Sequence, residues 1–195
     1  MSRSSSDTRA RILDCTWNLL ESGDKKVRMS DIAKASGISR QALYLHFPTR
    51  AELLVATTRH IDSVKNVDAR LAASRAATSG RERLVTFIGA WGGYIPQIHG
   101  MSVALRAMRA SDAEAAAAWD DRMQAVRHGC AAAVRALAAD ETLRPDLTEE
   151  RATDLLWTLL SVENWEHLVR DCGWSQSDYE RQIERLAEAA LLARV

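Results

Sequence analysis

Side chains that can contact the edges of nucleic acid bases are grouped in the segment from Arg40 to Leu45. Gln41 can form two hydrogen bonds to an adenine, Arg40 can do the same to a guanine, and Ala42 or Leu45 can touch a thymine methyl group. Each good bidentate pair contributes about 1 to 3 kcal/mol of discrimination between bases. The segment therefore has the chemistry of a major-groove reader. The alternative is a phosphate contact by Arg40 and a solvated Gln41.

A second set of side chains suits phosphate oxygens. Long cations and a phenol hydroxyl near helix starts can hold phosphates without carrying sequence information. We expect this role for Lys26, Arg28, Tyr44 and Arg50. For Tyr44 the alternative is packing on a turn. Ser39, as the cap of the helix that follows it, completes the set of expected DNA-binding residues.

Two short helices joined by a turn would present these residues. Apolar residues from Met29 to Ala33 have helical spacing, and Gly37 can take the left-handed conformation that ends a helix. Ser39 can then cap a second helix that begins at Arg40 by accepting from a backbone N–H of its first turn. This order of elements predicts a helix-turn-helix.

The second helix has an apolar side and a sharp end. Leu43 and Phe47 are four positions apart and form the stripe that we expect to be buried. Pro48 ends the helix, and Thr49 with Glu52 forms a capping box that begins a third helix. The remaining flanks of the second helix are then free to meet a duplex.

The N-terminal part of the chain resembles the TetR family of bacterial transcriptional regulators. The resemblance begins in RARILDCTWNLLESG at Arg9, continues through DIAKASGIS and LYLHF, and includes a basic residue after Thr49. Three positions depart from the family pattern. Asp24 replaces the usual Tyr or Phe, Arg28 a capping Thr or Ser, and Gln41 the glycine of many members. Base reading by Gln41 therefore has to be argued from its own chemistry.

The resemblance implies an all-α fold of two domains and about nine helices. Residues 1–48 would be a three-helix DNA-binding domain with the helix-turn-helix, and residues 49–195 a helical ligand-binding and dimerisation domain, joined by the helix from residue 49. It also implies a regulator, usually a repressor, that binds an inverted-repeat operator in double-stranded DNA as a homodimer through its last two helices. A small, largely apolar or aromatic effector would release it.

Charge is distributed unevenly along the chain of 195 residues. The formal net charge is zero, but residues 1–65 carry 11 Lys and Arg against 7 Asp and Glu, a balance of +4. Residues 66–195 have the opposite balance of −4. The N-terminal part is therefore the one suited to a polyanion such as DNA.

The first residues, MSRSSSDTR, contain no apolar core of a signal peptide. No run of the chain approaches the roughly 18 apolar residues of a membrane span. We therefore expect a cytoplasmic, nucleoid-associated bacterial protein. The SRSSS tail is expected to be disordered, with contact to a DNA minor groove as the alternative.

The rest of the chain reads as helix, because prolines are few and strand-like alternation is absent. Helices are expected over about 49–77, from about 81 to a break at GAWGGYIPQIHG, over 111–139 and 148–172, and from 175 or 177 onward. DETLRPDL is the expected loop before residue 148. Apolar residues between Leu155 and Val162 wrap more than one face, so one side needs a partner. The expected stripe of the last helix is Ile183, Leu186, Ala190 and Leu191.

Aromatic and methionine side chains near the glycine and proline break and on the later helices are candidates for an apolar effector pocket. The alternative for each of them singly is core packing. The candidate ligand-binding residues are Trp91, Tyr94, Ile95, His99, Met101, Met108, Trp119, Met123, Trp157 and Trp165.

Patterns typical of catalysis or metal binding are missing. Glu163, Glu166 and His167 come nearest, but a di-iron site needs Glu-x-x-His from two helices. No G-x-S-x-G, phosphate loop, H-E-x-x-H or zinc-finger spacing occurs, and the three cysteines have no C-x-x-C spacing. We expect neither an enzyme nor a bound metal or cofactor. Besides an enzyme, the other alternative to a ligand-responsive regulator is a helical DNA-binding or adaptor protein without ligand sensing.

Overall fold

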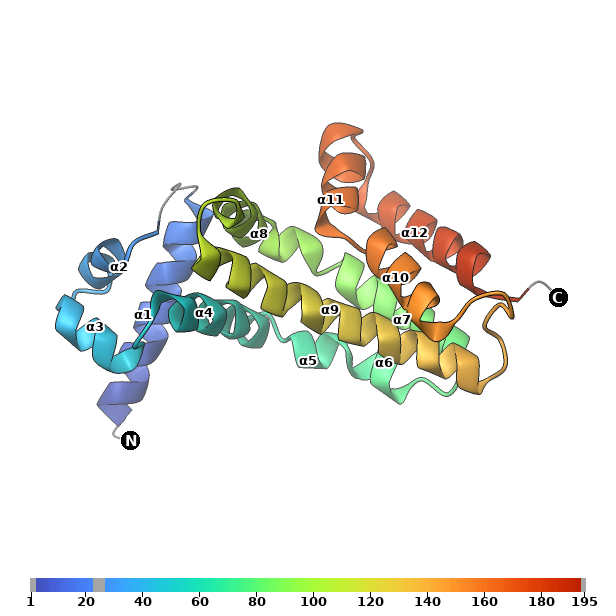
Figure 1. Ribbon diagram of the computed structural model, residues 1–195, viewed down its shortest axis with the longest axis horizontal. Coiled ribbons are helices and arrows are strands. Elements are labelled where there is room, and N and C mark those ends of the chain that lie inside the picture. Colours follow the sequence, from blue (N-terminus) through green and yellow to red (C-terminus); the bar gives the residue numbers. More distant parts are fainter. Residues whose placement is uncertain (1–2, 23–26, 194–195) are drawn as a thin grey trace. The chain divides into compact units, whose positions relative to one another are not determined.

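A computed structural model describes residues 3–22 and 27–193 of the chain (Figure 1), and within these ranges it contains helices and no strand. The expected all-α fold is therefore confirmed. The N-terminal helices are α1 (Arg3–Glu21), α2 (Met29–Ala35), α3 (Arg40–His46), α4 (Arg50–Val64), α5 (Val67–Arg70) and α6 (Ala72–Ala76). The later ones are α7 (Gly80–Gly92), α8 (Ile95–Arg109), α9 (Ala113–Ala139), α10 (Glu149–Leu159), α11 (Val162–Trp165), the π-helix η1 (Glu166–Asp171) and α12 (Gln176–Leu191).

The helices form two compact units. The first contains the described residues of Met1–Lys65 and Ile98–Arg122, and the second those of Asn66–Gln97 and Met123–Val195. Helices α8 and α9 each contribute residues to both units. The helix-turn-helix and the loop between α8 and α9 thus belong to the same unit.

The first unit is built around the packing of α1 on α4 and α2, and of α2 on α3. Its core includes Ile12, Leu20 and Ile32, each with a fully buried side chain. Gly37 ends α2 with a φ of 65°, as its place in the sequence predicts, and the N–H of Ile38 donates to the carbonyl of Ala33 across the turn.

In the second unit α7 packs against α6 and α12, and α12 against α10. Gly80 begins α7 where the chain approaches α9 closely: a Cβ at this position would lie 2.6 Å from the backbone carbon of Ala136. The N–H of Gly80 also donates to Asp140 at 2.5 Å. Only glycine fits this crossing without displacing one of the two backbones.

Two long helices expected from the sequence are interrupted. The one expected over 49–77 breaks at Asn66, whose φ of 54° is left-handed, a conformation that asparagine tolerates better than most residues. The one expected over 148–172 breaks before Ser161, whose hydroxyl caps α11 by accepting from the N–H of Asn164 at 3.1 Å. After α11 the chain continues as the π-helix η1.

At both ends of the chain the structure differs from what the sequence predicts. The SRSSS tail, expected to be disordered, is helical from Arg3 onward, so that expectation is wrong. Leu186 was expected in the buried stripe of α12 but is 42% exposed, whereas Tyr179 and Ala187 are buried beside Ile183 and Leu191.

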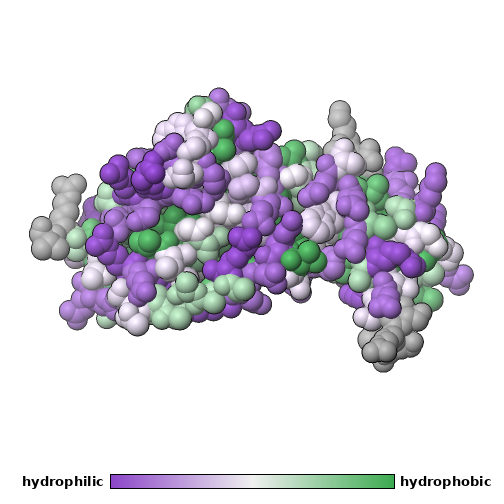
Figure 2. Space-filling model, turned by 180° about the vertical axis from the view of Figure 1, so that it is seen from behind, coloured by the Kyte–Doolittle hydropathy of each residue, from purple (hydrophilic) through white to green (hydrophobic). Residues whose placement is uncertain are grey.

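Hydrophilic side chains predominate on the face shown in Figure 2. None of the described helices has the length and apolar character that crossing a membrane requires.

The three cysteines are free thiols in different surroundings. Cys15 is half-buried, Cys130 is buried and Cys172 is exposed. Burial raises the pKa of the Cys130 thiol to about 12, so this side chain behaves as an apolar core group.

Candidate nucleic-acid interface

Helix α3 is anchored at its C-terminal end by the core and by α1. Leu43 is fully buried and Phe47 is 1% exposed, as their spacing predicts. Arg9 of α1 donates from Nη1 to the carbonyl of His46 at 2.8 Å, and its guanidinium lies 4.0 Å from the centroid of the Phe47 ring. Arg9 thus fixes the end of α3 by a hydrogen bond and a cation–π contact, a role that sequence reasoning missed.

The N-terminal end of α3 is capped as expected. The hydroxyl of Ser39 accepts from the N–H of Ala42 at 3.1 Å. Thr49 caps α4 in the same way, accepting from the N–H of Glu52 at 3.1 Å. With both ends fixed, α3 presents a defined side to solvent.

The surface of α3 that faces solvent is made by residues expected to meet DNA, four of them at base edges and Tyr44 at a phosphate. Arg40 and Gln41 are exposed, and Ala42 is partly buried. Tyr44 is 42% and Leu45 84% exposed. An 84% exposed leucine makes no contribution to the core and has the apolar surface that a thymine methyl group would meet. We call these five residues the recognition surface. Their DNA contacts stay predictions.

The helix that precedes the turn begins without the usual side-chain cap. Arg28 occupies the N-cap position of α2 and is exposed, and its backbone N–H donates to the Asp31 carboxylate at 3.4 Å. The carboxylate in the first turn thus supplies the reciprocal half of a capping box. Arg28 leaves its guanidinium available for the expected phosphate contact. Lys26, the neighbouring candidate, lies outside the described residues.

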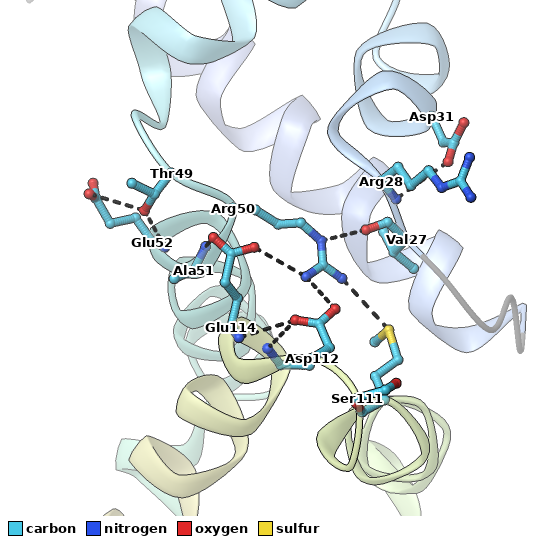
Figure 3. A network of polar contacts seen from close by, with 12 residues as sticks. Val27, Arg28, Asp31, Thr49, Arg50, Ala51, Glu52, Ser111, Asp112 and Glu114 are labelled. Carbon is cyan, nitrogen blue, oxygen red and sulfur yellow. Dashed lines mark hydrogen bonds and ion pairs between the residues drawn. The ribbon is translucent and has the colours of Figure 1, made fainter.

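Arg50, the fourth expected phosphate contact, has a side chain that is only 13% exposed. Its Nε donates to the carbonyl of Val27 at 2.6 Å, and its Nη1 donates to Asp112 at 2.7 Å and to Glu114 at 3.4 Å. Figure 3 shows the guanidinium between these three oxygens. No sequence pattern indicates this network, because Arg50 and Asp112 are 62 positions apart.

Asp112 and Glu114, which we call the acidic pair, also hold the ends of two helices. One oxygen of Asp112 accepts from the N–H groups of Glu114 and Ala115 at 3.1 Å each, capping α9. Glu114 accepts from the N–H of Ala51 in the first turn of α4 at 3.3 Å. Both carboxylates therefore lie where helix N-termini favour negative charge.

A groove of about 720 Å³ lies beside this network within the first unit. Arg28, Arg40 and Tyr44 line it together with Arg50 and the acidic pair. Residues of the recognition surface thus share a groove with two carboxylates. A duplex seated on α3 would come close to that negative charge.

The candidate effector residues are divided between the two units. Trp91, Tyr94 and Trp165 belong to the second unit, where the Trp91 and Tyr94 rings meet edge to face with centroids 5.9 Å apart. The indole N–H of Trp91 donates to the carbonyl of Leu160 at 2.8 Å, and that of Trp165 to Gln176 at 2.8 Å. These two tryptophans therefore have partners for their polar atoms inside the fold.

The remaining candidates differ in burial. Ile95 of the second unit is fully buried. In the first unit, Met101, Met108 and Trp119 are each almost fully buried. His99 of the first unit and Met123 and Trp157 of the second are partly buried. Burial alone agrees with core packing as well as with a pocket lining, so the effector contacts stay predictions.

In the cluster that came nearest to a catalytic pattern, Glu163 and His167 are exposed and Glu166 is half-buried. His167 Nδ1 lies 3.4 Å from Asp171, and both side chains are largely in solvent. Within residues 3–22 and 27–193 no three histidine, cysteine or acidic side chains are arranged to hold a metal ion.

The N-terminal sequence matches a family model. Residues 12–57 match the model described as bacterial regulatory proteins, tetR family. This range runs from the middle of α1 to the middle of α4 and contains the whole helix-turn-helix. The resemblance inferred from the sequence is thereby confirmed. None of the curated proteins matches the chain.

Solved structures share the fold over almost the entire chain. A putative transcriptional regulator from Saccharomonospora viridis, in complex with choline, has a TM-score of 0.73 and 21% identity, covering 97% of this chain and 100% of its own. A putative TetR-family regulator from Rhodococcus sp. has a TM-score of 0.73 and 21% identity, covering 94% and 98%. The regulator FadR from Bacillus subtilis, in complex with stearoyl-CoA, has 0.73 and 14%, covering 92% and 97%.

The matched residues define the N-terminal part of the chain as a DNA-binding domain of the helix-turn-helix class. Residues 12–57 carry the sequence pattern of the TetR-family DNA-binding domain, and the fold of the whole chain is similar to that of solved TetR-family regulators.

Proposed function

We propose that the protein is a ligand-responsive repressor that binds an inverted-repeat operator as a homodimer. Residues 1–48 would read DNA, and residues 49–195 would bind the effector and the second subunit. A small, largely apolar or aromatic effector would release the operator. The protein would act in the bacterial cytoplasm, on the nucleoid.

The observation that carries this proposal is the recognition surface. Buried Leu43 and Phe47, the Ser39 cap and Arg9 hold α3 from both ends, while Gln41 and its neighbours stay exposed. Preorganised polar side chains on a short exposed helix suit the major groove, which offers a distinct donor and acceptor pattern for each base pair. Two such helices related by a twofold axis would read two half-sites.

Replacing Gln41 by alanine is expected to relax base preference at one position of each half-site. Without its bidentate hydrogen bonds, about 1 to 3 kcal/mol of discrimination disappears there. Affinities for operator variants changed at each position in turn would measure this. As a control, Arg28→Ala should weaken binding evenly across the variants and reduce the salt slope by about 0.9 for each phosphate that is no longer neutralised. An unchanged base preference in Gln41→Ala would refute base reading by this residue.

The second subunit is expected to cover apolar side chains on α10 and α12. Ala152 and Leu156 of α10 point into the core, whereas Leu155 is 43% exposed, with the half-buried Leu159 one turn further on. On α12, Leu186 is 42% exposed beside the buried stripe. Each helix thus has a second apolar side, as helices of a four-helix bundle do.

Replacing both Leu155 and Leu186 by glutamate is expected to weaken dimerisation at least 100-fold. Association would desolvate the added charges without pairing them, which costs about 3 to 5 kcal/mol. Sedimentation velocity over a range of concentrations measures the change. Val64→Glu is the matched control, because Val64 is 49% exposed on α4, outside the expected interface. Equal association of all three proteins would exclude this interface.

The effector proposal rests on the aromatic and methionine residues and on the family resemblance. The neighbouring structures with choline and stearoyl-CoA support a small-molecule effector for this chain as well. An effector can change operator affinity only by binding two states of the dimer unequally. A screen for compounds that raise the unfolding temperature, followed by operator binding with each hit, tests this. Operator affinity that no binding compound changes would favour a DNA-binding protein without ligand sensing.

A further inference from the structure

We infer that Arg50 is a positioning residue for DNA recognition, held in place by the acidic pair, and that it does not bind a DNA phosphate. The inference rests on the proposed function, because positioning is defined by its effect on operator binding. The arrangement belongs entirely to the first unit, which contains the helix-turn-helix and the start of α9.

The Arg50 guanidinium makes contacts within the first unit through all three of its nitrogen atoms. A guanidinium has five N–H donors in one plane and no acceptor. Its Nε is bonded to Val27, its Nη1 faces both carboxylates of the acidic pair, and its Nη2 lies 3.7 Å from the sulfur of Met108. With 13% of the side chain exposed, a phosphate would have to compete with these partners for the guanidinium.

Arg50 holds the start of α2. Val27 is 1% exposed, and its carbonyl belongs to the residue just before the N-cap of α2. The 2.6 Å hydrogen bond from Arg50 therefore fixes the point at which α2 begins. Helix α2 packs on α3, so a shift of Arg50 would move α2 and with it the recognition surface.

The acidic pair in turn holds Arg50. Asp112 is fixed by the two N–H groups that it caps, and Glu114 by the N–H of Ala51. The acidic pair is thus preorganised around the guanidinium, as Figure 3 shows. Charge-assisted bonds of a partly buried arginine to a fixed carboxylate are stronger and more geometrically specific than those of a mobile surface pair.

The sign of one electrostatic effect separates positioning from phosphate binding. Asp112 lines the same groove as Arg40 and Tyr44, so its negative charge repels an approaching duplex. Removing that charge alone would raise DNA affinity. If Asp112 positions Arg50, its removal lowers operator affinity even though the repulsion is gone.

The experiment compares Arg50→Gln, Arg50→Lys and Asp112→Asn with the wild-type protein. Each is titrated over a salt series against a duplex selected by the wild type from a random pool, and against an unrelated duplex of equal length. Positioning predicts that all three lose about tenfold or more in affinity for the selected duplex. Affinity for the unrelated duplex should stay nearly unchanged in the two Arg50 variants and stay the same or rise in Asp112→Asn, with the salt slope nearly unchanged in all three. Lysine fails because its single ammonium cannot replace the planar fork of donors.

Phosphate binding predicts a different set of results. Arg50→Gln would then weaken binding to both duplexes and reduce the salt slope by about 0.9, whereas Arg50→Lys would keep most of the affinity. Asp112→Asn would bind the selected duplex as tightly as the wild type or more tightly. Any of these outcomes would overturn the inference and leave the proposed function intact.

Arg59→Gln is the matched control for the loss of one positive charge from α4. The Arg59 side chain is 63% exposed and pairs with Asp121 of α9 at 3.1 Å, so the substitution removes an exposed α4 to α9 ion pair outside the network. Burial raises the pKa of Asp121, but its hydrogen bonds and charge interactions with Arg122 and Arg59 outweigh this and leave that pKa lowered. Subtracting the change in affinity caused by Arg59→Gln from that caused by Arg50→Gln separates positioning from long-range electrostatics.

A measurement without DNA makes the test independent of operator binding. Amide hydrogen exchange over residues 29–35 should become faster in Arg50→Gln and Asp112→Asn than in Arg59→Gln, at temperatures well below unfolding for all variants. Unchanged exchange in α2 would overturn the inference even if no operator were found. Failure of the wild type to select any duplex would instead refute the proposed function.

Discussion

Replacing Gly80 by alanine is expected to lower the free energy of unfolding by about 3 kcal/mol. The added Cβ would lie 2.6 Å from the backbone carbon of Ala136 and 2.6 Å from the backbone nitrogen of Leu137. These are main-chain atoms of α9, which cannot rotate away as a side chain can. Either α7 or α9 must move, and the hydrogen bond from Gly80 to Asp140 is strained with it.

Gly89→Ala is the matched control, since it makes the same change in the same helix. Beyond its own stretch of α7, a Cβ at Gly89 would have no heavy atom of the described residues within 4 Å. Alanine should therefore stabilise the protein by about 0.5 to 1 kcal/mol, because glycine has the greater backbone entropy to lose. Urea unfolding of the two variants gives both values. Equal effects would mean that α7 and α9 do not approach each other in this way.

Replacing Leu43 by alanine is expected to destabilise the protein by about 2 to 5 kcal/mol and to abolish specific DNA binding. Leu43 is fully buried and is the only residue within α3 that is buried. The cavity would loosen the packing between α3 and the core. Fluorescence-monitored urea unfolding and operator titration measure the two losses.

Leu45→Ala separates the two sides of α3. Leu45 is 84% exposed, so the same truncation two residues away should change stability by no more than about 0.5 kcal/mol. Any effect on DNA binding must then come from the absence of the leucine side chain at the DNA surface. Comparable destabilisation by the two substitutions would contradict the orientation of α3.

The helix-turn-helix could be predicted because its determinants are local. Gly37, Ser39 and Thr49 act on backbone groups within a few positions of themselves, and all three take the roles that their residue types favour. The burial of Leu43 and Phe47 follows from a spacing of four.

What the sequence did not reveal depends on contacts between distant segments. Nothing in the chemistry of Arg50 distinguishes a phosphate ligand from a partner of Asp112, because that choice is made by how α9 packs. Arg9, which anchors α3, is 37 positions from His46. The break at Asn66 escaped prediction because a single left-handed residue leaves no mark on hydrophobic periodicity.

Binding selection on a pool of random duplexes, followed by footprinting, tests the central claim most directly. The claim is that the recognition surface of α3 enters the major groove of operator DNA in a dimer. The account predicts enrichment of an inverted repeat whose half-sites are spaced by about one helical turn or a multiple of it, with protection centred on both. Recovery of duplexes without any common sequence, bound with the same salt dependence as the starting pool, would contradict it.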